Sequence, residues 1–214
     1  MTTTTSIPPP AGQEPLHGRE PALARLLTAD GHSLPPAGGV GEETWSEHVR
    51  HWIALFGTGP GTTVWEAGCG AGSFLYPFYR RGCTVGGTDL SGGLIGEARA
   101  AMPAGVFAVT GPAAVPVIPA ADLLVASASS AYLDTAERAG AVLRQMAARA
   151  RRAVLVTGIL DPTARAARVH RYWTRDWFTA ALRAAGLPRV AVASHFLPGY
   201  GTDPLRFSAW GWCE

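Results

Sequence analysis

The 214-residue sequence contains no lysine, and all 18 of its basic residues are arginines. They are scattered along the chain, with doublets only at Arg80-Arg81 and Arg151-Arg152, and the formal net charge is +2. A protein that binds nucleic acid usually gathers its basic residues into a stripe or patch. The distribution therefore argues against a DNA or RNA partner.

Cysteine is also scarce, with Cys69, Cys83 and Cys213 alone. An odd number of cysteines at spacings that fit no metal site favours reduced thiols in the cytoplasm. Apolar runs are far shorter than a membrane span, and the N-terminal stretch has neither the basic nor the apolar region of a secretory signal. We therefore expect a cytoplasmic protein that does not contact a membrane.

The beginning of the chain differs in composition from the rest. Residues 1–15 are rich in Thr and Pro and predict a disordered tail. Residues 16–61 predict a helical cap, in which a short helix over 20–28 is followed by a loop over 31–41 that holds Pro and Gly. A hinge of this composition would let the cap act as a lid.

A longer helix follows the loop. Thr44, with Glu47 three residues later, fits a capping box, so we expect the helix to begin at Thr44. Trp45 and Trp52 share its apolar face, and Gly57 is expected to end it.

From residue 62 to residue 214, strand-like apolar runs alternate with helix-like segments. This alternation predicts a mostly parallel sheet with helices on both faces. The last two strands have no helix between them and predict an antiparallel hairpin. Asp134 and Glu137 form a second capping pair, and Thr174 is expected to cap the last helix. The expected strands are 62–66, 84–89, 106–109, 121–127, 153–157, 190–196 and 205–212, and the expected helices are 72–81, 92–101, 134–150 and 174–185.

The most informative segment reads VWEAGCGAGSFL, from Val64 to Leu75. A strand ends at Glu66, a glycine turn follows, and a helix is expected next. Ligands of such sheets bind beyond the carboxyl ends of the strands, where glycines let the backbone approach and free N–H groups point at the ligand. A dinucleotide site needs a third glycine where Ser73 stands. An acidic residue at Glu66 would also repel a pyrophosphate.

This segment resembles motif I, E/D-x-G-C-G-x-G, of the class I S-adenosylmethionine-dependent methyltransferases. The next strand ends at Asp89, whose carboxylate can accept hydrogen bonds from ribose hydroxyls, and Asp-Leu-Ser there resembles motif II. The resemblance implies a Rossmann-like three-layer sandwich around a seven-stranded sheet with an antiparallel C-terminal strand. It also implies that residues 62–214 bind S-adenosylmethionine and release S-adenosylhomocysteine. The cofactor-binding residues implied are Trp45, Glu66, Gly68, Cys69, Gly70, Gly72, Asp89, Leu90, Ser91, Thr110, Gly111 and Ser127.

The second half of the chain resembles the family more loosely. The stretch after Ser127 ends in Tyr-Leu, as motif IV does, but lacks the usual Asn or acid, so a catalytic metal is not expected. A His-x-Tyr-Trp segment and a Gly-Tyr-Gly…Arg-Phe segment are similar to one subgroup of small methyltransferases. The acceptor-binding residues expected from these segments are Tyr132, Tyr172, Trp173, Tyr200 and Arg206.

Histidine is the usual proton acceptor near neutral pH. His170 is the first candidate for a general base because it lies in the aromatic- and Arg-rich segment after the fifth strand. His48, on the predicted cap helix, is the second. His51 and His195 are further candidates, and any of the four can instead be structural.

The function predicted is O- or N-methylation of a small molecule, in specialised (natural-product) metabolism, by a monomer or homodimer. A non-methylating enzyme that binds S-adenosylmethionine on the same fold is an alternative. A cofactor-binding accessory subunit is another. A nicotinamide-dependent oxidoreductase is disfavoured by Ser73.

Overall fold

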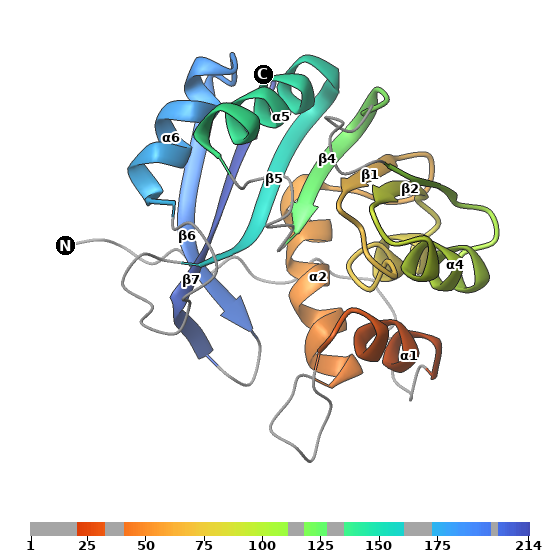
Figure 1. Ribbon diagram of the computed structural model, residues 1–214. Helices are drawn as coiled ribbons and strands as arrows, with labels where there is room; N and C mark the ends of the chain where they lie inside the picture. Colours follow the sequence, from red (N-terminus) through yellow and green to blue (C-terminus); the bar gives the residue numbers. More distant parts are fainter. Residues whose placement is uncertain (1–20, 33–40, 111–117, 128–134, 161–172, 198–200) are drawn as a thin grey trace.

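The computed structural model describes residues 21–32, 41–110, 118–127, 135–160, 173–197 and 201–214 (Figure 1). Its centre is a seven-stranded sheet in the order β3-β2-β1-β4-β5-β7-β6. Neighbours from β3 to β5 run parallel, and β7 runs antiparallel to both β5 and β6. The predicted sheet, its antiparallel C-terminal strand and the final hairpin are confirmed. The strands are β1 (Thr63–Ala67), β2 (Thr84–Asp89), β3 (Val106–Val109), β4 (Ala121–Ser127), β5 (Ala150–Leu160), β6 (Arg189–Leu197) and β7 (Gly201–Trp212).

Helices cover both faces of the sheet, and Figure 1 shows α5 and α6 side by side near β5 and β6, well away from α1 and α4. Alternate residues of β4 explain the two layers. Leu123 and Val125 pack toward the α1–α4 face, whereas Leu124 and Ala126 pack toward α5 and α6. Strands buried on both faces need apolar residues at successive positions. The helices are α1 (Pro21–Ala29), α2 (Glu42–Phe56), α3 (Tyr76–Arg80), α4 (Gly92–Ala101), α5 (Ala136–Arg149) and α6 (Arg175–Ala184).

Two predicted helix starts are wrong. Thr44 lies inside α2, which begins at Glu42 after an extended Gly41 that makes no side-chain cap. Two acidic residues in the first turn favour this earlier start through the helix dipole. The α5 cap is Thr135, whose hydroxyl accepts a hydrogen bond from the Arg138 N–H at 3.1 Å. Asp134 lies outside the described residues.

Some of the other predicted helix and strand boundaries are confirmed, and others are wrong. Thr174 caps α6 as predicted, and Gly57 ends α2 in the left-handed conformation, at φ 58°. The helix predicted over 72–81 is reduced to α3, with Pro77 in its first turn, because turns occupy residues 73–75. β5 extends beyond its predicted bounds because Ala150 pairs with β4 and its carboxyl end pairs with β7 as far as Leu160, and β7 begins earlier than predicted because residues 201–203 pair with β6. The predicted tail, residues 1–15, lies outside the described residues.

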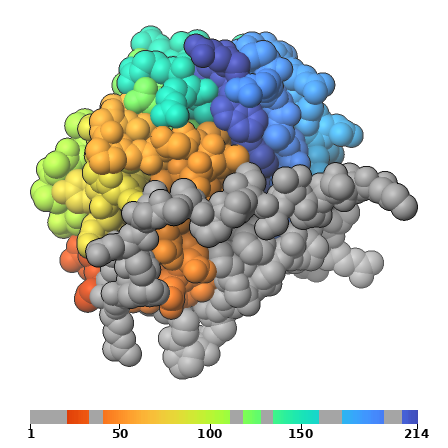
Figure 2. Space-filling view, turned by 180° about the vertical axis from the view of Figure 1, so that it is seen from behind, coloured from red at the N-terminus to blue at the C-terminus, as the bar shows by residue number. Residues whose placement is uncertain are grey.

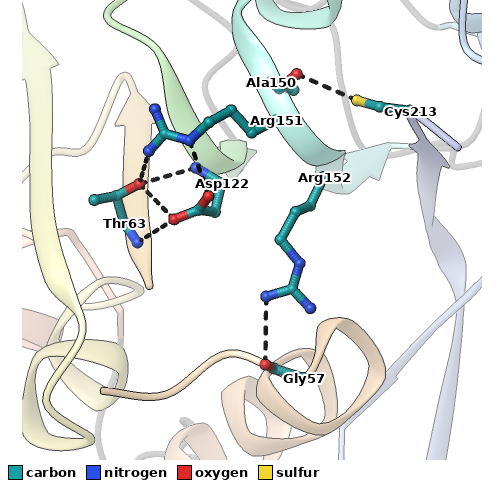
Figure 3. A network of polar contacts seen from close by, with 7 residues as sticks. All are labelled: Gly57, Thr63, Asp122, Ala150, Arg151, Arg152 and Cys213. Atoms are coloured by element: carbon teal, nitrogen blue, oxygen red, sulfur yellow. Dashed lines mark hydrogen bonds and ion pairs between the residues drawn. The ribbon is translucent and has the colours of Figure 1, made fainter. Parts of the chain in front are cut away.

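A polar network joins the amino ends of β1, β4 and β5 (Figure 3). The Asp122 carboxylate accepts hydrogen bonds from the Thr63 N–H and hydroxyl, both at 2.8 Å, and from Arg151 Nε at 3.0 Å. Although burial opposes ionisation, the hydrogen bonds from Arg151 and Thr63 lower the pKa of Asp122 to about 2. This end of the sheet is therefore fixed by matched partners.

The C-terminal end of α2 is attached to the same edge. Arg152 Nη2 donates to the Phe56 carbonyl at 2.8 Å, and the Phe56 ring contacts Trp212 at 6.2 Å between centroids. Trp52 contacts Trp210 at 5.4 Å. Figure 2 shows the orange segment that contains α2 lying against the dark-blue C-terminal residues. In the described part of the chain, every helix is too short or too polar to cross a membrane.

Candidate active site

The glycine-rich loop lies at the carboxyl ends of β1 and β4, where the strand order changes direction. Such a switch point is the usual ligand site of an open α/β sheet. Gly68, Gly70 and Gly72 have φ values of 76°, 55° and 85°, which side chains disfavour. The predicted loop is therefore built as the sequence required.

The loop is held against β2. The N–H groups of Gly68 and Cys69 donate to the Thr88 carbonyl at 2.7 and 2.9 Å. A Cβ at Gly87 would overlap with Cys69, so glycine at this position of β2 is what allows the close approach. The sequence held a signal for this contact in the Gly86-Gly87 pair, which the prediction did not use.

Asp89 lies at the end of β2, next to the loop. One carboxylate oxygen accepts from the Gly70 N–H at 3.0 Å and the other from the Ser91 N–H at 2.9 Å. Each oxygen retains a free lone pair, because a carboxylate can accept about four hydrogen bonds. The two backbone contacts fix the carboxylate while leaving it able to accept from a ligand.

Glu66 is the most strongly perturbed acid of the site. It is 1% exposed, and burial raises its pKa to about 8, with the nearby charges of Asp30 and Asp89 adding to the effect. Ser127 hydrogen-bonds to the carboxyl group, yet Oε2 has no partner among the described residues. Buried polar atoms are rarely left without a partner, and exceptions gather where a ligand completes the site.

Asp30, which the sequence analysis did not single out, also reaches the loop. It follows α1, and its carboxylate accepts hydrogen bonds from the Ala71 N–H at 2.5 Å and the Ser73 N–H at 3.1 Å. Burial raises its pKa, and these hydrogen bonds oppose the rise. The Asp-Gly pair after a helix indicates only a helix end, so no local pattern revealed this contact.

Trp45, one of the predicted cofactor-site residues, brings α2 into contact with the loop. Its Nε1–H donates to the Ser73 carbonyl at 2.8 Å, and its ring lies 4.6 Å from His32 and 5.8 Å from His48 between centroids. The loop is thus flanked on one side by residues of α1 and α2.

Two of the four candidate histidines meet in the interior. The rings of His48 and His195 lie 4.5 Å apart between centroids, and the two residues are 2% and 7% exposed. His48 Nε2 accepts a hydrogen bond from Trp52 Nε1 at 3.3 Å. In the neutral ring the proton therefore sits on Nδ1. His51 is exposed beside Trp52 and takes no part in the pair.

His195 is surrounded by hydroxyl groups. Its Nδ1 lies 3.4 Å from both Thr157 Oγ1 and Ser208 Oγ, which are 2.7 Å apart. Burial, together with the positive charge of Arg206, lowers the pKa of His195 to about 4. The same charge contributes to a lowered pKa at His32. Arg206, a predicted acceptor-binding residue, lies near this cluster and donates from Nη1 to the Gly158 carbonyl at 3.4 Å.

The remaining predicted residues fall into three groups. Ser91 caps α4 and accepts from the Leu94 N–H, while Leu90 is 38% exposed. Thr110 donates its N–H to the Asp89 carbonyl at 2.9 Å. Trp173 instead lies 4.2 Å from Trp177 on the α5–α6 face, apart from the loop residues. Gly111, Tyr132, His170, Tyr172 and Tyr200 lie outside the described residues. In the part of the chain that the structure describes, no group of three His, Cys, Asp or Glu side chains is arranged to hold a metal.

No family model matches the chain. Magnesium-protoporphyrin O-methyltransferase from Synechocystis sp. (strain ATCC 27184 / PCC 6803 / Kazusa) is 38% identical to this chain over 60 residues. The matched segment spans 28% of this chain and 26% of that relative's length.

Solved structures extend the likeness over most of the chain. Magnesium protoporphyrin IX methyltransferase (ChlM) from Synechocystis PCC 6803, with bound SAM, has a TM-score of 0.61 at 20% identity, over 81% of this chain and 79% of that one. CalS10, an amino pentose methyltransferase from Micromonospora echinaspora solved with SAM, has a TM-score of 0.63 at 17% identity, over 82% and 93%. At these identities the likeness establishes the fold. The chain therefore has the fold of the class I S-adenosylmethionine-dependent methyltransferases.

Proposed function

We propose that this protein is an S-adenosylmethionine-dependent methyltransferase that acts on a small molecule. The observation that carries the proposal is the buried Glu66 carboxyl group, with one oxygen lacking a partner among the described residues, beneath a glycine loop at the sheet's switch point. The names of the relatives, which are methyltransferases for a magnesium porphyrin and an amino pentose, support it.

The residues present fit this cofactor. Its ammonium and sulfonium groups are positive, and Glu66 supplies a buried acceptor that a cationic ligand would keep ionised. Asp89 keeps lone pairs for ribose hydroxyls, and the exposed Leu90 next to it offers an apolar surface for the adenine. In this proposal the other cofactor-site residues are those expected from the sequence, namely Trp45, Gly68, Cys69, Gly70, Gly72, Ser91, Thr110, Gly111 and Ser127.

When bound, the cofactor would supply a methyl group already activated by the sulfonium. The protein then has to orient the acceptor, exclude water and, for a hydroxyl or ammonium acceptor, remove a proton. We retain His48 and His170 as the proposed bases; His48 would take up a proton at Nε2, in place of the hydrogen bond that it accepts from Trp52. The lowered pKa of His195 keeps that neighbouring ring neutral at pH 7, so it does not repel a positive charge on His48. Arg206 would orient an anionic group on the acceptor.

The acceptor class and the setting remain part of the proposal. Nitrogen or oxygen methylation in natural-product metabolism is the version we favour, and residues 16–61 would act as the cap over the site. If a protein lacking residues 1–41 bound the cofactor and turned over as the full chain does, the cap would have no such role.

Isothermal titration of the full chain with S-adenosylmethionine, S-adenosylhomocysteine and NADH tests the proposal. We expect micromolar binding of the first two and none of NADH. Asp89→Ala should abolish most of this binding, whereas the matched variant Asp176→Ala, in the exposed first turn of α6, should bind as the wild type does. Binding of NADH alone would indicate an oxidoreductase, and binding of none of the three would leave an accessory scaffold as the better interpretation.

A further inference from the structure

The Asp30 carboxylate occupies the centre of the glycine loop, although it comes from a different part of the chain. It accepts hydrogen bonds from the N–H groups of Ala71 and Ser73, 41 and 43 residues away. Its Oδ1 lies so close to Gly70 that a Cβ there would overlap with it. The surface of the loop that glycine leaves open is therefore covered by an acidic side chain.

The position of Asp30 is set by the packing of α1. Leu23, Leu26 and Leu27 are fully buried against the core, and Arg25 Nε pairs with Glu97 Oε2 of α4 at 2.9 Å. Figure 1 shows α1 beside α4. Helix packing thus delivers a third carboxyl group to a loop that already has Glu66 and Asp89 beside it, and the charge of Asp30 contributes to the raised pKa of Glu66.

The groups that bind Asp30 would bind any ligand carboxylate equally well. Two neighbouring backbone N–H groups form strong hydrogen bonds to an ionised carboxylate and have no means of distinguishing a side chain from a ligand. The cofactor of the proposed function carries an amino-acid carboxylate. The glycine at position 70 leaves room for a ligand to approach the loop backbone. In this structure Asp30 occupies the position that the carboxylate of such a ligand would take.

We propose that Asp30 is an internal competitor of the cofactor, a carboxylate that occupies the N–H groups of Ala71 and Ser73 until the cofactor's own carboxylate replaces it. Release of Asp30 detaches the end of α1 from the loop, so α1 is a latch that opens when the site fills. The inference rests on the proposed cofactor and is independent of which acceptor is methylated.

Affinity measurements separate this role from the opposite one, in which Asp30 stays and binds the cofactor's ammonium. We compare S-adenosylhomocysteine with 5′-methylthioadenosine, which has the nucleoside but no amino-acid part. Asp30 is held by the N–H groups of Ala71 and Ser73 and by the Ser73 side chain, and loss of this competitor should let Asp30→Ala bind S-adenosylhomocysteine about tenfold more tightly. The affinity for 5′-methylthioadenosine should change by less than about twofold, since it has no carboxylate to compete.

Matched variants test whether a change in affinity arises only because α1 packs less tightly. Glu97→Ala removes the ion pair with Arg25 and leaves the loop contacts intact, so it should not change either affinity. Asp30→Asn keeps the size of the side chain but not its charge, and should give part of the gain. Thermal unfolding of each variant establishes that it is folded before it is titrated.

Hydrogen exchange gives a readout in the wild-type protein. Saturating S-adenosylhomocysteine should speed exchange at the end of α1, where the Asp30 and His32 N–H groups bond to Leu26 and Leu27. 5′-Methylthioadenosine should not. Weaker or unchanged binding of S-adenosylhomocysteine by Asp30→Ala, or slower exchange in α1, overturns the proposal. If neither ligand binds wild type or variant, the proposed cofactor falls and the latch with it, whereas normal wild-type binding without the variant's gain removes the latch alone.

Discussion

The two ends of the sheet shift the pKa values of their acidic side chains in opposite directions. At the amino ends, Asp122 lies within 3.0 Å of matched donors from Thr63 and Arg151, and its pKa falls. At the carboxyl ends, Glu66 is buried with the half-buried Asp30 near it, and the pKa of each rises. Both edges belong to the same strands, so the fold does not dictate the difference. Acids held against their preferred ionisation are typical of sites that bind or react.

Stability as a function of pH gives the largest expected contrast. The pKa of Glu66 is raised from 4.5 to about 8, so the folded state holds a proton that the unfolded state releases. The contribution of protonated Glu66 to stability is fully present below about pH 4.5 and is lost as the pH rises toward 8. Between these limits the free energy of unfolding is expected to fall by about 1.4 kcal/mol per pH unit.

Glu66→Gln mimics the protonated form and should remove that slope. Denaturant unfolding of the wild type and the variant from pH 5 to 8 measures it, with Glu43→Gln, an exposed residue in α2, as the control. Parallel stability curves for wild type and Glu66→Gln would mean that Glu66 is ionised in the folded protein.

Cofactor affinity should separate Asp89 from Asp122. Asp89→Ala removes a carboxylate expected to bind two ribose hydroxyls and should weaken binding about 100-fold, roughly 2.7 kcal/mol. Asp122→Ala, at the opposite edge, should leave the affinity within about twofold. Titration calorimetry with S-adenosylhomocysteine makes the comparison, and equal losses in the two variants would show that Asp89 acts only through the fold.

Asp122→Ala should instead lower the free energy of unfolding by about 1–2 kcal/mol, because Thr63 and Arg151 lose their shared partner. Because the folded pKa is lowered from 3.8 to about 2, this contribution is present above pH 3.8 and lost as the pH falls toward 2. Urea unfolding at pH 7 and pH 3 measures the difference. A deficit that is as large at the lower pH would argue against an ionised Asp122.

The smallest effect is expected at Arg152, which donates to the Phe56 carbonyl from an exposed position. Arg152→Ala should cost about 1 kcal/mol of stability and leave cofactor affinity unchanged. Arg149→Ala, at the exposed end of α5, is the matched control and should cost less. Loss of cofactor binding in Arg152→Ala would show that the two edges communicate through α2.

The parts of the molecule that sequence predicted best depend on neighbours along the chain. The strand, glycine turn and Asp89 follow from residue spacing, and Gly57 and Thr174 terminate helices by local chemistry. Capping pairs were less reliable. Thr44 gave a false start because Glu42 and Glu43 favour an earlier helix start through the helix dipole, and this outweighs the cap that Thr44 could supply.

What could not be predicted depends on helix docking. Asp30 reaches Ala71, and His48 reaches His195, only because α1 and α2 pack on the sheet as they do. The hydrophobic periodicity of a helix or strand does not indicate such contacts, because each partner fits the pattern of its own element whether or not the other is present. The docking of α1 also explains why a further acidic side chain, Asp30, lies at the glycine loop in addition to Glu66 and Asp89.

The attachment of α2 at both ends has a mechanical consequence. Arg152 binds the Phe56 carbonyl, next to the left-handed Gly57, and Trp45 binds the Ser73 carbonyl about three turns away, on the order of 16 Å along the axis. A tilt of about 10° around Phe56 would move Trp45 by roughly 3 Å, which is enough to break its hydrogen bond to Ser73. The helix therefore connects the amino edge of the sheet to the glycine loop, so a tilt of α2 and a movement of the loop occur together.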